Sequence, residues 1–183
     1  MPGGGAYTGT IAGRRVGDTV ELSWDTTAGR YFGIGLEEEG AWYVACGEDA
    51  GGLGLALVHR GGELRWSPAP ARGTVGRGAL SPVFTRWGGP AWLARPTPPA
   101  GFPFSGLTLE GTGEVRTVAL AGGAVERGVA LPTAVGWAIA WYPRFDQTVI
   151  LRYLPGRRRG TWQAVWALGG HPEPAVELLR PVH

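Results

Sequence analysis

The sequence contains no lysine, one cysteine and three histidines, and each scarcity removes a class of site. All 17 basic residues are Arg, which indicates a compositional bias, because a phosphate-binding design would enrich Arg locally rather than everywhere. Cys46 is the single cysteine, so no internal disulfide can form. His59, His171 and His183 are scattered and lack the spacing of metal ligands. No metal and no other cofactor is therefore expected.

Long apolar runs are also absent, and no segment reaches the length of a transmembrane helix. The N-terminus lacks the basic stretch and apolar stretch of a secretory leader. These absences predict a cytoplasmic protein with no membrane partner, although a secreted chain without its leader would look the same. The net charge of only +2 disfavours a nucleic-acid partner.

Glycine and proline are abundant, with 33 Gly and 15 Pro, a level at which disorder has to be considered. Nine Trp and many short apolar alternations argue against disorder, because disordered chains are poor in aromatic residues. The composition therefore predicts a folded, turn-rich, all-β protein.

Two tryptophan-bearing stretches organise the chain. Residues 135–142 (Val-Gly-Trp-Ala-Ile-Ala-Trp-Tyr) alternate so that both Trp and the Ile share one face of a strand. Residues 41–46 (Ala-Trp-Tyr-Val-Ala-Cys) show the same alternation, and Trp42 precedes Trp137 by 95 positions. Two such strands at matched places indicate a duplicated β unit.

Other strand-like segments recur in the same order at offsets of 95–97, with Trp162 matched to Trp66 at 96. The predicted organisation is a first β repeat over residues 1–80, a proline-rich packed linker over 81–103 and a second β repeat over 104–183. Large residues facing Gly and Ala suit the interior of a small barrel. The fold class is therefore all-β and antiparallel, either one calycin-like barrel or two packed barrel or sandwich repeats. The pattern leaves open whether each repeat closes alone or both form one body.

Part of the second repeat resembles the avidin/streptavidin family. Residues 134–141 (Ala-Val-Gly-Trp-Ala-Ile-Ala-Trp) are similar to that family's Ala-Leu-Gly-Trp-Thr-Val-Ala-Trp strand, and residues 163–168 (Gln-Ala-Val-Trp-Ala-Leu) to a later Trp-bearing strand. The resemblance covers about residues 134–168. It implies an eight-stranded up-and-down barrel, with Trp141 and Trp166 on tryptophans that line the biotin pocket.

The sequence departs from that family in three respects. The polar residues that hold the ureido group have no match here, nor has the pocket tryptophan contributed by a neighbouring subunit, and the internal duplication is foreign to the family. The resemblance therefore favours a calycin-like barrel rather than biotin binding.

No catalytic constellation is recognisable, so the protein is predicted not to be an enzyme. Its serines lie in no nucleophile elbow, and the stretch Gly51–Gly54 lacks the Lys-Ser/Thr of a phosphate loop. The acidic runs Glu37–Glu39 and Glu48–Asp49 are typical of solvated loops rather than of a divalent-ion site.

Two features remain as candidate sites. The first is a set of strand tryptophans, which would either fill a core or line an aromatic pocket. They predict a non-catalytic binding module for a small apolar or amphipathic ligand or for a protein partner. These residues are Trp42, Trp66, Trp137, Trp141, Trp162 and Trp166.

The second feature is the turn Arg157–Arg159, with Arg152 close by in sequence. It is either an exposed hairpin tip or a site for an anion or a single-stranded nucleic acid, with Arg supplying the charge and aromatic rings the stacking. A further alternative is a structural or oligomerisation role, in which exposed strand edges join subunits into a homo-oligomer.

Overall fold

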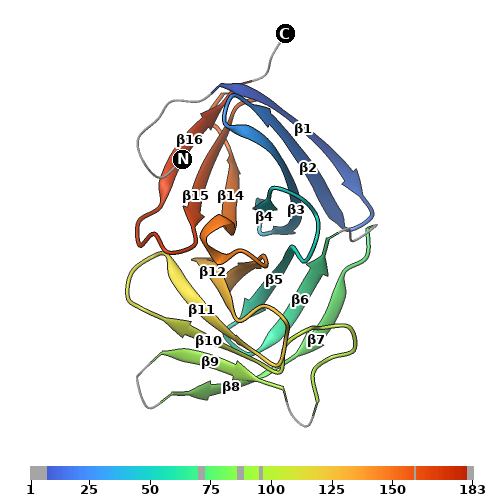
Figure 1. The fold of residues 1–183 in the computed structure, drawn as a ribbon, viewed down its shortest axis with the longest axis vertical. Helices are drawn as coiled ribbons and strands as arrows, with labels where there is room; N and C mark the ends of the chain where they lie inside the picture. The colour runs from blue at the N-terminus through green and yellow to red at the C-terminus, as the bar shows by residue number, and fades with distance from the viewer. Residues whose placement is uncertain (1–7, 70–72, 86–88, 95–96, 159, 181–183) are drawn as a thin grey trace.

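The protein folds into two antiparallel β-sheets in the computed structural model, which describes residues 8–69, 73–85, 89–94, 97–158 and 160–180. Among these residues every strand pairing is antiparallel, and the helical structure is limited to the short 3-10 segment η1 (Phe145–Gln147). This confirms the predicted all-β, antiparallel fold. Figure 1 shows the two sheets as curved bodies, one above the other.

The first sheet has seven strands and curves into a half-barrel (Figure 1). The first four strands of the chain lie side by side in it, and three strands from the C-terminal end complete it. In spatial order the strands are β1 (Gly9–Val16), β2 (Thr19–Thr26), β3 (Gly29–Glu38), β4 (Ala41–Gly47), β14 (Val149–Pro155), β15 (Trp162–Leu168) and β16 (Ala175–Leu179).

The second sheet has nine strands and forms a nearly closed barrel. Its two outermost strands are consecutive in the chain, separated only by Leu80, so one bent segment supplies both ends of the sheet. The spatial order is β7 (Gly76–Ala79), β6 (Glu63–Pro68), β5 (Gly54–His59), β13 (Gly136–Trp141), β12 (Arg127–Pro132), β11 (Arg116–Ala121), β10 (Gly106–Glu110), β9 (Pro90–Leu93) and β8 (Ser81–Phe84).

The two sheets exchange strands in a reciprocal way. After β4 the chain leaves the half-barrel, and β5 pairs with β13 in the barrel; after β13 it leaves the barrel, and β14 pairs with β4. In these ladders Trp42 lies opposite Tyr153 and Trp137 opposite Val58. The predicted boundary between repeats therefore does not separate the sheets, because each sheet contains strands from both sides of it.

Alternating side chains divide the interior into three apolar layers. The predicted alternation of the two Trp-bearing strands holds, because the two faces of each strand lie in different layers. On β4 and β13 the Trp-bearing faces point into the hollow of their own sheets, while the opposite faces meet in a shared layer between the sheets. Tyr43 and Ala138, for example, are both buried in that shared layer. The two sheets are thereby packed into one body through the middle strands.

Bulky rings in the barrel lie over glycines of neighbouring strands. Gly54 is the ladder partner of Trp141, and a Cβ at Gly54 would lie 2.2 Å from the indole ring. Gly76 is likewise the partner of Trp66, with the same 2.2 Å approach. The pairing of large residues with glycine is thus how these rings fit inside the barrel.

Two sequence predictions need correction. The segment 81–103 was predicted to be a linker, but β8 and β9 within it form the edge of the barrel. The second prediction is the match of Trp66 with Trp162. Trp66 lies opposite Ala56, and Leu151, which stands 95 positions after Ala56, lies opposite Trp166. The ladders therefore match Trp66 with Trp166 rather than with Trp162. The longer turn between β14 and β15 shifts the alignment after it.

Candidate ligand-binding groove

The concave face of the half-barrel is packed at one end and open at the other. At the packed end Trp24, Val44 and Leu151 are buried together, and Cys46 and Trp166 belong to the same cluster. Burial raises the pKa of the Cys46 thiol to about 12, so this thiol is a neutral packing group rather than a nucleophile.

At the open end lies a groove with a volume of about 690 Å³. Both edge strands of the sheet, β1 and β16, contribute to its wall, so the groove lies between the two ends of the half-barrel. Gly9 and Gly13 on β1 also line the groove. Apolar and aromatic side chains form most of the rest of the lining, namely Ile11, Val20, Leu22, Trp42, Tyr153, Trp162 and Leu179.

Two tryptophans supply the aromatic surface of the groove. Trp42 comes from β4 and is half-buried, with the guanidinium of Arg15 lying 4.9 Å from its ring centroid. Trp162 begins β15 and is 36% exposed. The same Arg15 forms an ion pair of 2.8 Å with Glu37, so its charge is compensated. The groove therefore offers an indole surface to a ligand at both of these strands.

The barrel of the second sheet is filled instead. Trp66, Phe102, Phe104 and Trp141 form a chain of tilted and edge-on ring contacts with centroid distances of 5.1–6.5 Å. All four rings are buried, and Trp92 from β9 is buried beside them. This interior leaves the tryptophans no free surface for a ligand.

The six predicted tryptophans are therefore separated by the fold. Trp42 and Trp162 line the groove, and Trp166 lies in the packed end of the same half-barrel. Trp66 and Trp141 are core residues of the barrel, and Trp137 is half-buried at its side with Arg116 over its ring.

The predicted arginine site is not one cluster. Arg157 and Arg158 are exposed in the turn before β15, and Gly160 of the same turn lines the groove. Arg159 lies outside the described residues. Arg152 lies opposite Tyr43 in the β4–β14 ladder. Burial raises the pKa of Tyr43, and Arg152 partly offsets that rise.

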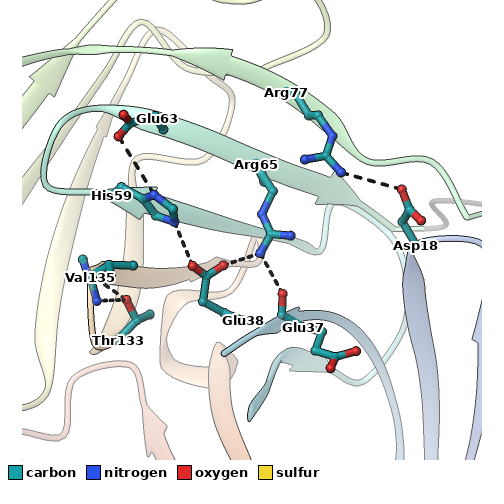
Figure 2. Close-up of polar contacts among 10 residues, drawn as sticks. Asp18, Glu37, Glu38, His59, Glu63, Arg65, Arg77, Thr133 and Val135 are labelled. Atoms are coloured by element: carbon teal, nitrogen blue, oxygen red, sulfur yellow. Dashed lines mark hydrogen bonds and ion pairs between the residues drawn. The ribbon is translucent and has the colours of Figure 1, made fainter. Parts of the chain in front are cut away.

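A polar cluster around Glu38 joins the two sheets. Glu38, at the end of β3, accepts a hydrogen bond from Arg65 of β6, and its other carboxylate oxygen lies 2.8 Å from His59 Nε2 of β5 (Figure 2). The Glu38 side chain is only 10% exposed. The prediction of a solvated acidic loop was therefore wrong for Glu38. No local signal could have shown this, because its partners lie more than twenty positions away.

Comparisons with family models, curated proteins and solved structures give no match. Within the described ranges, no group of three His, Cys, Asp or Glu residues is placed to hold a metal ion. The part of the chain that the structure describes also has no helix long and apolar enough to cross a membrane.

Proposed function

We propose that the protein is a non-catalytic binding module whose half-barrel groove takes a small apolar or amphipathic ligand. The observation that carries this proposal is the groove itself, with its volume of about 690 Å³ and its lining of apolar and aromatic side chains. Ligand sites of drug-sized molecules typically have volumes of about 300–1,000 Å³ and largely apolar walls.

The contrast between the two sheets supports a role in binding. Trp66 and Trp141 are 3% and 4% exposed and fill their own barrel, whereas Trp162 is 36% exposed beside the groove. An apolar ligand lying on Trp42 and Trp162 would remove their exposed surface from water, which is worth about 25 cal/mol per Å².

Groove filling tests the proposal with a neutral fluorescent probe, N-phenylnaphthylamine. The native protein should enhance its emission, and Gly13→Phe should abolish most of that binding by placing a ring in the groove. The Cβ of this variant meets only the flexible end of Leu22 and one backbone oxygen. The matched control is Gly61→Phe in an exposed turn, where a Cβ approaches only the carboxylate of Glu63. Failure of the native protein to bind the probe, or equal binding by both variants, would refute the proposal.

Self-association is a second candidate function, favoured by apolar side chains on two edge strands. Phe84 on β8 is 99% exposed, and Val176 and Leu178 on β16 are 62% and 70% exposed. Exposed edges with apolar residues are surfaces on which another chain can pair. Light scattering over a range of concentrations should then show a dimer or larger species that Leu178→Lys disperses; a monomer at every concentration would exclude it.

A further inference from the structure

The charge that lines the groove has one sign. Among the described residues, the charged side chains of the lining are Arg14, Arg15 and Arg180, and no Asp or Glu contributes. The groove therefore combines an apolar floor with a basic rim.

The two arginines of the β1 side are compensated. Arg14 forms an ion pair of 2.7 Å with Glu21, and Arg15 one of 2.8 Å with Glu37. The positive charge on this side of the groove is therefore largely neutralised by the protein's own carboxylates.

On the β15–β16 side of the groove, by contrast, the arginines form no ion pairs among the described residues. Arg180 is exposed directly after β16 and forms no ion pair among the described residues. Arg157 and Arg158, in the turn that brings Gly160 to the groove, likewise have no ion pair within the described ranges. The residues outside those ranges contain no Asp or Glu side chain. Among the described residues, the groove arginine without an ion pair is thus Arg180, next to Leu179, the ladder partner of Trp162.

We propose that the ligand is an amphipathic anion whose apolar body lies on Trp42 and Leu22 and whose anionic head lies at Arg180, near the turn before β15. This inference rests on the proposed binding function and specifies its ligand class. An anionic head gains a charge-assisted hydrogen bond from the guanidinium, which is stronger than a bond between neutral groups.

A cationic head is disfavoured by two features of the site. Arg180, which forms no ion pair among the described residues, repels it. The guanidinium of Arg15 already makes the cation–π contact with the Trp42 ring, 4.9 Å from its centroid, so a cationic head would bring a second positive charge beside it.

Displacement of bound N-phenylnaphthylamine by three ligands with the same alkyl chain tests the head group. These are dodecanoate and dodecyltrimethylammonium, each used below its micelle concentration, and dodecanol, used below its solubility limit. Dodecanoate should displace the probe at about one tenth of the concentration that dodecanol requires, with the ammonium weakest. Raising the ionic strength from about 0.02 M to about 0.5 M should reduce the advantage of dodecanoate, because salt screens the head-group interaction.

Substitutions of single arginines test where the anionic head group binds. Arg180→Gln should remove most of the advantage of dodecanoate over dodecanol, and Arg180→Lys should retain part of it. Arg60→Gln is the matched control, because Arg60 is also exposed and forms no ion pair among the described residues, but lies in the β5–β6 turn. Circular dichroism checks that each variant is folded.

The outcomes separate this inference from the function on which it rests. If the probe binds but dodecanol displaces it as well as dodecanoate, or the ammonium does so better, the anionic head is refuted and the groove remains a ligand site. The anionic head at Arg180 is also refuted if Arg180→Gln and Arg60→Gln have the same effect on the advantage of dodecanoate over dodecanol. If the probe does not bind the native protein, both proposals fail.

Discussion

Replacing Gly54 with alanine should destabilise the protein, because the Trp141 ring occupies the space that a methyl group would need. A Cβ at Gly54 would lie 2.2 Å from Cζ2 and 2.3 Å from Cε2 of Trp141. Carbon atoms in contact lie about 3.5–4.0 Å apart, so the ring or the strand must shift by about 1 Å. Trp141 is 4% exposed, and Phe104 lies edge-on against it at 5.1 Å, which restricts such a shift.

Overpacked cores typically lose about 1–3 kcal/mol, and the rigid ring places Gly54→Ala towards the upper part of that range, about 2–3 kcal/mol. Urea denaturation followed by circular dichroism measures this loss. Gly61→Ala is the matched control and should change the free energy of unfolding by less than about 0.5 kcal/mol, since its Cβ approaches only the exposed carboxylate of Glu63.

A double-mutant cycle tests the assigned cause. Trp141→Phe removes part of the indole and should by itself cost about 1–3 kcal/mol through the space it leaves. Combined with Gly54→Ala, the added methyl group enters that space, so the double variant should be at least about 1 kcal/mol more stable than the sum of the single losses predicts. Strictly additive losses would show that the contact with Trp141 is not the source of the strain.

Three further predictions concern the polar cluster, the buried thiol and the tryptophans. Glu38→Gln should lower the free energy of unfolding by about 1–3 kcal/mol in urea denaturation, because it weakens two contacts of a nearly buried carboxylate; Asp25→Asn, in an exposed ion pair, should cost less than about 1 kcal/mol. Burial raises the pKa of Cys46 from 9.0 to about 12, so the thiol ionises first in the unfolded chain. The contribution of this thiol to the free energy of unfolding should therefore be fully present below pH 9.0 and be lost by about 1.4 kcal/mol per pH unit between pH 9.0 and about 12. Cys46→Ala should reduce this pH dependence, as measured by urea denaturation at a series of pH values. Trp66→Ala should cost about 3–5 kcal/mol, whereas Trp162→Ala should cost about 1 kcal/mol or less while weakening probe binding; similar losses for both would contradict the distinction between a filled barrel and an open groove.

The sequence was sufficient to predict the strands and their faces where large residues alternate. Trp42 and Trp137 both point into the hollow of their own sheet, as the period of two requires. Gly13 shows the limit of this reasoning, since a glycine before two arginines resembles a turn, yet β1 continues through it to Val16. Only the pairing with the neighbouring strand β2 shows that Gly13 lies within a ladder, where it lines the groove.

Strand exchange could not be predicted, because a sequence pattern indicates which residues share a face but not which strand lies beside it. The ladder positions nevertheless follow one offset: Trp42 pairs with Tyr153, Trp137 pairs with Val58, and both members of the first pair have their counterparts 95 positions away in the second. Equal registers in the two exchanged ladders are the arrangement that an internal duplication would give, and the duplication stays a prediction. Duplicated units would form identical pairings either within themselves or with each other, so the sequence alone leaves the two arrangements equivalent.

The groove could not be predicted either, because it depends on a difference between the two sheets: the barrel has the hairpin β8–β9, and the half-barrel has no such hairpin among the described residues. In the barrel, β10 pairs with β9, and the β8–β9 hairpin bridges the space between β10 and β7, with Trp92 buried inside. In the half-barrel, β1 and β16 take the places of β10 and β7 in strand order, and both line the groove that lies between them. A ligand in the groove would therefore occupy the place that Trp92 and its hairpin fill in the other sheet. The same curvature that is filled by apolar side chains in one sheet thus leaves an open groove with a largely apolar lining in the other.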